Sequence, residues 1–523
     1  MYKNPIRPLW ERWEESPINF KEIAAVIAIV AVSDRLIYHS GGYSGYAVAL
    51  AAIAILIAFG VYRPRFGIPT VACITILAML ILRLVWQGSG LAFWIGLGMI
   101  PAFVYALANF VPYTPDWLYY VGSLPLISYR RIACYLDGYY HGRQQTNPKR
   151  WLNLGLPLVV LILFGGIFIL ANPSLIEYVS NAATRFGNSL IDLLKNLSVA
   201  EILFCMMVGY LGFGSVRPRL VKPRPEITTL ATAAEEQPSS LYVPFRNSLL
   251  TVVALFGVYL CFEFSTLWFR DFPEGFYYAG YAHRGAAWLT IALGLATVVL
   301  SFIFRGDTLL DPRRSLLRKL AWAWSLQNLL LALSVYNRMA IYIDFNGMTR
   351  MRTIGLFGIT TVLVGFVFVL IKIIQERSFL WLLRRQLWVL SLAVVIYALL
   401  PVDWLVHRYN VKQVMAGEIA PAVQISVHPI NNEGYLALFP LLNHDDEIVR
   451  NGIQAMLAKR YQFLQSQRQD SVHQTKWTAY QGAEVTLWNR LTAEQAVFQS
   501  YLDDQAAQDL AIKMFDQHVA EWY

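Results

Sequence analysis

The sequence predicts an all-α fold: a polytopic helical membrane protein with about 11 transmembrane helices and a small helical extracytoplasmic C-terminal domain. Three observations support this prediction. Of the 523 residues, 56% are hydrophobic and only 15% are charged, whereas soluble domains have about 25% charged residues. Apolar runs of about 20 residues, long enough to cross a bilayer, recur along the chain. Residues 406–523 instead carry apolar side chains at helical spacing between charged ones.

Eleven apolar runs are candidate spans, of which the first and the sixth are the shortest or most interrupted. They cover residues 20–38, 43–62, 67–86, 89–111, 152–172, 198–213, 246–266, 285–304, 319–343, 353–373 and 386–405. Another segment, 117–140, carries aromatic residues and two arginines, which suits a helix on the cytoplasmic surface or an ordinary loop helix.

Prolines and small polar residues fill residues 214–244, which is typical of a flexible linker. We therefore expect a first membrane half at 1–213 with six spans and a second at 245–405 with five. Residues 406–523 form the predicted extracytoplasmic domain.

The basic residues alternate between loops as the positive-inside rule requires. With the N-terminus in the cytoplasm, each cytoplasmic segment holds two to five Lys or Arg, and each outer loop holds two at most. An odd number of spans then places the C-terminal tail outside. The predicted location is the bacterial inner membrane, with the protein threading through it many times.

Several classes of function are not supported by the sequence. The net charge of +9 comes from the membrane part, since residues 406–523 carry nine Lys/Arg and thirteen Asp/Glu. This distribution fits cytoplasmic loops better than nucleic-acid binding. The four cysteines are scattered without a CxxC pair, and the tail histidines lack zinc-site spacing. No Walker A, GxGxxG, GxSxG or HExxH motif occurs. We expect no cofactor, no metal and no nucleic acid.

The tail is predicted to contain two amphipathic helices. Asp445, Asp446 and Glu447 begin the first, where the helix dipole favours acidic side chains. The second follows Thr492-Ala-Glu-Gln495, a capping-box pattern.

Charged and polar residues near the outer ends of the spans form the candidate site. Charges in lipid are costly unless they are paired or solvated. Arg338 is expected to pair with Glu263 or Asp34, and Asp344 with Arg284 or Arg350. The Asp344→Ala variant is expected to uncouple the tail from the membrane part. The predicted polar junction or ligand site comprises Asp34, Arg35, Arg83, Glu263, Tyr281, His283, Arg284, Tyr336, Arg338, Tyr342, Asp344, Arg352, Asp403, Arg408 and Asn410.

Three interpretations of these groups remain open: structural ion pairs, an outward-facing cavity for an ion or small solute, or a catalytic site with His283 as acid or base. No individual catalytic residue is assigned.

Three motifs together resemble a known family. They are Tyr281–Thr290, Leu333–Arg352 and Val406–Asn410, the last ahead of an acidic helical tail. In this combination the chain resembles the uncharacterised bacterial multipass membrane proteins classed as domains of unknown function, of the four-one-seven-three and four-one-five-three type. The resemblance implies architecture and the location of a site, and it implies no activity. The chain departs from the pattern at His283, where the family has arginine, and at the inserted Asn337.

The leading functional hypothesis is a non-enzymatic scaffold, sensor or assembly component of the cell envelope. Its expected partners are the lipid bilayer and an envelope protein that contacts the tail. The first alternative is an outward-facing transporter or channel for an ion or small solute. The second is a lipid-linked glycosyltransferase, against which the first outer loop, at about 39–42, is very short.

Overall fold

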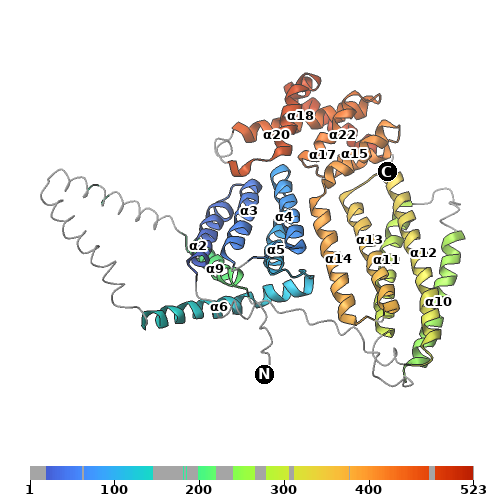
Figure 1. The fold of residues 1–523 in the computed structure, drawn as a ribbon. Helices are drawn as coiled ribbons and strands as arrows, with labels where there is room; N and C mark the ends of the chain where they lie inside the picture. Colours follow the sequence, from blue (N-terminus) through green and yellow to red (C-terminus); the bar gives the residue numbers. More distant parts are fainter. Residues whose placement is uncertain are drawn as a thin grey trace. The chain divides into compact units, whose positions relative to one another are not determined.

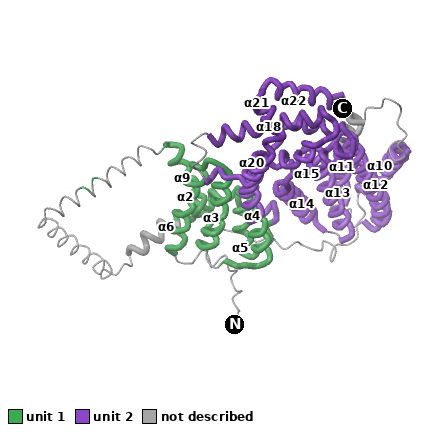
Figure 2. The backbone as a smooth tube through the Cα atoms, turned by 90° about the horizontal axis from the view of Figure 1, so that it is seen from above, with its two compact units in different colours: residues 1–77, 97–112, 117–221 green, residues 78–96, 113–116, 222–523 purple. Residues whose placement is uncertain are grey.

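The computed structural model describes residues 19–61, 64–144, 181, 184, 198–218, 240–265, 278–304, 311–375, 377–469 and 477–521. Every element within these ranges is a helix (Figure 1), as the sequence predicts. The chain divides into two compact units, coloured separately in Figure 2. Unit 1 comprises residues 1–77, 97–112 and 117–221, and unit 2 comprises residues 78–96, 113–116 and 222–523.

In unit 1, helix α2 (Phe20–Ser33) packs against α3 (Tyr43–Gly60) and α9 (Val199–Val216). Small residues permit this close approach, as is common between apolar helices. A Cβ atom on Gly60 would lie 2.8 Å from the Cβ of Ala25 and 2.9 Å from Cγ1 of Val216.

A buried ion pair joins the start of α2 to the end of α9. The guanidinium of Arg217, which follows α9, donates to the carboxylate of Glu22 in the first turn of α2, at 3.2 Å. The Arg217 carbonyl accepts a hydrogen bond from Nε of Arg131 in α6 (Thr114–Gln144). Since the start of α2 meets the end of α9, these two helices run antiparallel.

In unit 2, five long helices precede the C-terminal region: α10 (Tyr242–Glu263), α11 (Tyr278–Ile303), α12 (Arg314–Asn346), α13 (Arg350–Gln375) and α14 (Phe379–Leu399). Helix α12 is central, because it contacts α10, α11 and α13. One apolar core lies around Trp324 and Phe366, and a second lies around Leu331 and Ile359. Helix α10 thus packs on α12, and α11 packs on both α12 and α13, through largely apolar contacts, as is expected of helices in lipid.

Among the described residues after α14, seven α-helices follow, which we call the C-terminal helices. They are α15 (Val402–Met415), α16 (Val423–Val427), α17 (Asn432–Leu438), α18 (Glu447–Gln469), α20 (Gly482–Ala493), α21 (Gln499–Asp503) and α22 (Gln505–Ala520). Their shared core includes the fully buried Phe498 and Phe515. Gly452 of α18 lies directly against the Phe515 side chain, so α18 and α22 approach each other where no larger residue fits.

Of the two tail helices predicted from the sequence, the first begins where predicted and the second does not. The first begins as predicted, because the Asp446 carboxylate accepts the backbone N–H groups of Ile448 and Val449 at the start of α18. The capping box proposed at Thr492 is wrong. Thr492 lies in the last turns of α20, and its hydroxyl donates to the carbonyl of Trp488. The same residue spacing also occurs inside helices, so it does not by itself mark a helix start.

The second of these helices starts further along. Asp504 caps α22 by accepting the N–H groups of Ala506 and Ala507. Residues 494–503 before it form short helical turns and not one continuous helix.

Among the described residues, seven helices are long and apolar enough to span a membrane. They are α3, α4 (Ile68–Trp86), α5 (Gly90–Leu107), α9, α10, α13 and α14. Helix α2 has 14 residues, and the apolar part of α11 is limited to Trp288–Leu300. The predicted span at 152–172 lies outside the described residues. The chain is therefore a helical membrane protein, and the count of eleven spans stays a prediction.

Candidate functional site

A buried ion pair joins α10 to α12 in unit 2. Nε and Nη2 of Arg338 donate to the two carboxylate oxygens of Glu263, at 2.7 and 2.5 Å. The two side chains are 2% and 0% exposed. The hydroxyls of Ser334 and Tyr259 also donate to this carboxylate. Each hydroxyl lies four residues before its charged neighbour, hence on the same helical face. Glu263 is one of the two partners that the sequence suggested for Arg338.

The turn between α12 and α13 is shaped by a glycine and an arginine. Gly347 has φ of +77°, a conformation that L side chains rarely adopt. The Arg352 guanidinium donates to the carbonyls of Asn346 and Gly347 and lies over the Tyr342 ring at 3.9 Å. A cation at these carbonyls offsets the negative end of the α12 dipole.

The C-terminal helices bind the backbone of this same turn. The Asn410 side chain accepts from the N–H of Met348 at 2.6 Å and donates to its carbonyl at 2.9 Å. The Gln424 amide donates to the Asn346 carbonyl. A Cβ on Gly347 would lie 2.8 Å from Oδ1 of Asn410, so the glycine is required by contact as well as by conformation.

Asp403, in the first turn of α15, is a buried carboxylate that accepts three hydrogen bonds. Nε and Nη2 of Arg350 donate to its two oxygens, and the N–H of Asn431 donates to Oδ2 at 3.1 Å. Asp403 is 3% exposed, whereas Arg350 is 46% exposed. Arg350 also donates to the Pro429 carbonyl. One carboxylate thus joins α13, α15 and the segment before α17.

A third ion pair attaches the segment between the end of α4 and the start of α5 to the C-terminal helices. Both Nη atoms of Arg83 donate to the carboxylate of Glu433 in α17, which is 2% exposed. Nearby, the amide of Gln481 donates to the Leu84 carbonyl and accepts the Gly88 N–H. These residues all belong to unit 2.

The structure brings some of the predicted site residues together and separates others. Arg83, Glu263, Arg338, Tyr342, Asp344, Arg352, Asp403 and Asn410 make the unit 2 contacts described here. Asp344 accepts a hydrogen bond from Tyr409, and Arg350 pairs with Asp403 instead of Asp344. Asp34 and Arg35 belong to unit 1.

The remaining predicted residues contribute less. Tyr336 bonds the Thr360 hydroxyl, and Arg408 stacks on Trp404 one turn earlier in α15. The side chains of Tyr281, His283 and Arg284 lie outside the described part of the chain.

Three contributors were missed in the sequence: Gln424, Glu433 and the buried His407. Arg350 was named there as a possible partner of Asp344 and was not included among the site residues. The place of Arg350 directly after the Asn-Gly turn is the signal that could have marked it as a site residue. Glu433 and Gln424 carry no such signal, because their partners lie 350 and 78 residues away in the chain.

His407 of α15 is buried beside Asp403, and its Nδ1 has no hydrogen-bond partner among the described residues. Burial lowers the pKa of this imidazole from 6.5 to about 4, with Asp403 opposing and Arg350 adding to the shift. A Cβ on Gly434 would lie 2.7 Å from its Cδ2 atom, so the ring fills a confined space. The ring is therefore neutral at physiological pH.

Acid should loosen the C-terminal helices through His407. The folded-state pKa lies below the 6.5 of the free side chain, so the unfolded chain binds the proton first. The resulting stability is complete above pH 6.5 and declines as the pH falls towards 4, by about 3 kcal/mol. Pulse proteolysis of the purified protein between pH 7.5 and 4.5 measures this decline. His407→Gln should reduce the acid sensitivity. The control His428→Gln, at an exposed histidine that is the smallest of the causes that shift the His407 pKa, should retain most of it. Identical pH profiles for wild type and His407→Gln would contradict the assignment.

The junction is arranged for holding helices together. Glu263, Asp403 and Glu433 each accept two donors from one guanidinium, a geometry that gives strong, directional pairs.

Comparison with known proteins agrees with the motifs. The family model described as Domain of unknown function (DUF4153) matches residues 46–428, well over half of the chain. The match includes the long helices of unit 2 and continues through α15 and α16. Searches of curated proteins and of solved structures find no match. The chain therefore belongs to the DUF4153 family, a family of unknown function.

Proposed function

We propose that this protein is a membrane-anchored scaffold, sensor or assembly component of the bacterial cell envelope, whose C-terminal helices present a binding surface to an envelope protein. The observation that carries the proposal is the way these helices are attached. Asp403, Asn410 and Glu433 fix them to α13, to the α12–α13 turn and to α4. A surface attached at these points moves with the membrane helices. Binding of a partner to the surface therefore also acts on those helices.

The proposed topology keeps eleven spans in the inner membrane, with the N-terminus in the cytoplasm and residues 406–523 outside. The seven long apolar helices supply most of the spans. Helices α2, α11 and α12 and the run at 152–172 supply the others. The distribution of basic residues supports this orientation.

A groove on the C-terminal helices is the proposed binding surface. It has a volume of about 410 Å³ and lies between α18 and the α21–α22 segment. Its lining is mainly apolar and includes Leu510, 58% exposed, and Met514, 48% exposed. Glu447 contributes a carboxylate at the rim.

The chemistry of the groove favours one kind of partner. An amphipathic helix binds such a groove through apolar residues one turn apart. Residues 406–523 carry four more acidic than basic side chains, so a helix with basic flanks gains from charge complementarity. The proposed partner is therefore an envelope protein with an exposed basic amphipathic helix.

Photocrosslinking in intact cells tests this surface. A photoreactive residue at Ala511, inside the groove, should yield one discrete protein adduct. The Leu510→Asp substitution should reduce that adduct at least about tenfold, because it places a charge in an apolar contact. The matched control is the same photoreactive residue at Val427, which is 68% exposed and lies outside the groove.

Two outcomes would contradict the binding surface: equal adducts from positions 511 and 427, or an adduct that Leu510→Asp leaves unchanged. A transporter is less well supported. It needs a polar path past Arg338, and among the described residues Leu260, Val335 and Ile359 of α10, α12 and α13 form an apolar cluster beside that level.

A further inference from the structure

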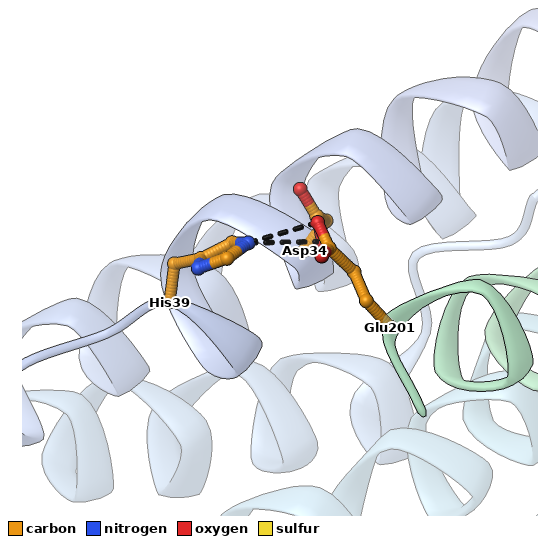
Figure 3. Close-up of side chains that lie close together, drawn as sticks. All are labelled: Asp34, His39 and Glu201. Carbon is orange, nitrogen blue, oxygen red and sulfur yellow. Dashed lines mark hydrogen bonds and ion pairs between the residues drawn. The ribbon is translucent and has the colours of Figure 1, made fainter. Parts of the chain in front are cut away.

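Three side chains of types that ligate metals, those of Asp34, His39 and Glu201, converge in unit 1 (Figure 3). Nε2 of His39 lies 2.9 Å from Oε1 of Glu201 and 3.8 Å from Oδ1 of Asp34. All three ligand atoms lie within 4.8 Å of one another. Ligands bound tetrahedrally to one zinc ion are about 3.3 Å apart. The observed spacings bracket that value.

The backbone between Asp34 and His39 brings the two residues onto one face. Residues five apart in an α-helix point about 140° away from each other. Here, Asp34–Tyr38 form a π-helical turn, η1, and the His39 N–H bonds the Asp34 carbonyl, five residues back. π-Helical turns are rare and occur frequently at functional sites. The irregular turn thus aligns two ligands that a regular helix would separate.

The third ligand is oriented by the start of α9. Ser198 and Glu201 form a capping box, in which the Glu201 N–H donates to the Ser198 hydroxyl and the Ser198 N–H donates to Oε2 of Glu201. The cap engages Oε2, and Oε1 faces His39. A hydrogen bond between Tyr38 and Ser198, at 2.8 Å, joins the π-turn to this cap. Supporting contacts of this kind are typical of metal ligands.

The cluster opens onto a cavity. A groove of about 440 Å³ is lined by Asp34, Glu201 and Cys205, with apolar side chains of α2 and α9 around it. The Cys205 thiol lies one turn after Glu201 and donates to Asp34 at 3.7 Å. His39 and Asp34 are 45% and 30% exposed, so an ion can enter and keep an outer ligand.

We propose that Asp34, His39 and Glu201 bind one divalent transition-metal cation of the zinc type. An imidazole nitrogen among the ligands selects against Mg²⁺ and Ca²⁺, which prefer oxygen ligands throughout. Two carboxylates balance the charge of the cation. The bound ion joins the α2–η1 segment to α9, at the opposite end of these helices from the Glu22–Arg217 pair. In the proposed topology this end faces the extracytoplasmic side.

Zinc binding by the full-length protein in mild detergent tests the proposal. After stripping with chelator, the protein is dialysed against Zn²⁺, desalted and analysed for metal by mass spectrometry. Wild type should retain about one Zn²⁺ per chain, as a three-ligand site predicts. His39→Ala and Glu201→Gln should retain almost none. Glutamine at position 201 keeps the capping pattern, so Glu201→Gln removes the charged ligand without removing the helix start.

The matched control is His518→Ala, which breaks another histidine–carboxylate pair, with Asp446 at 3.2 Å. It should retain zinc like wild type. Zn²⁺ should also raise the unfolding temperature of wild type and not that of Glu201→Gln.

Three results would overturn the site: no retained zinc in wild type, equal retention in His39→Ala, or displacement of zinc by a modest excess of Mg²⁺. The first two would reduce the cluster to an ion pair between His39 and its carboxylates, and the third would assign the wrong class of cation.

Discussion

Replacing Arg338 with alanine should destabilise the helices of unit 2 more than any other single change at the junction. The substitution leaves the Glu263 carboxylate buried without its guanidinium partner, beside the hydroxyl donors of Ser334 and Tyr259. Removing one partner of a buried ion pair costs about 3–5 kcal/mol. A loss of this size is a large fraction of the free energy of unfolding of most proteins. We therefore expect little folded Arg338→Ala protein.

Size-exclusion chromatography of detergent extracts and thermal unfolding measure this loss. The control is Arg408→Ala, because Arg408 is exposed and stacks only on Trp404 of its own helix. It should behave like wild type.

A double variant shows how much of the stability loss comes from breaking the Arg338–Glu263 ion pair and how much comes from lost packing. Arg338→Met combined with Glu263→Leu replaces both charges by apolar side chains of similar volume. Replacing a whole buried ion pair in this way is often neutral or stabilising. The double variant should therefore recover most of the stability that Arg338→Ala loses. Wild-type stability in Arg338→Ala would show instead that Glu263 is solvated, and it would reopen the hypothesis of an outward-facing cavity.

Sequence patterns predicted the properties that depend on neighbouring residues. Long apolar runs gave the membrane class and most of the long helices, and the Asn346-Gly347 pair marked the turn between α12 and α13. The cost of charge in lipid predicted that Arg338 needs a partner on another helix, and Glu263 was among the candidates.

Residue pairs that form only through tertiary contact could not be predicted reliably from the sequence. Arg350 was considered for Asp344, but it binds Asp403, 53 residues away. His39 and Glu201 are 162 residues apart. Neither gives a local sequence signal, because the alignment of His39 depends on a π-helical turn and that of Glu201 on a helix cap. A histidine and a glutamate at such a distance cannot be matched without knowing which helices are neighbours.

The sequence and the structure also point to different residues for the attachment of the C-terminal helices to the membrane helices. The sequence suggested Asp344. In the structure, Asp344 accepts one hydrogen bond from the Tyr409 hydroxyl, in exposed surroundings. Asp403 accepts two guanidinium donors and one backbone N–H, and it is buried. The greater number of contacts and the burial assign the coupling role to Asp403.

The Asp403→Ala variant should therefore release the C-terminal helices from α13. It leaves the Arg350 guanidinium and the Asn431 N–H without their acceptor. Because Arg350 is half exposed and water can solvate it, we expect a loss of about 2–3 kcal/mol, less than for a fully buried pair. Limited proteolysis should then cut between α14 and α18 at least about tenfold faster, since each 1.4 kcal/mol changes the open population tenfold. The long helices of unit 2 should keep their stability, because their apolar cores do not include Asp403.

Asp344→Ala is the matched comparison, since it removes the same side chain from the neighbouring contact. The Asp344 contact is exposed, so water replaces the lost acceptor and the net loss is below about 1 kcal/mol. This variant should therefore be cut at close to the wild-type rate. If Asp344→Ala were cut as fast as Asp403→Ala, the attachment would be spread evenly over the junction. If only Asp344→Ala were cut faster, the interpretation from sequence would be right and the Arg350–Asp403 pair would be a surface contact. The order of the two rates thus decides whether α15 is held mainly by its buried first turn or by its exposed face.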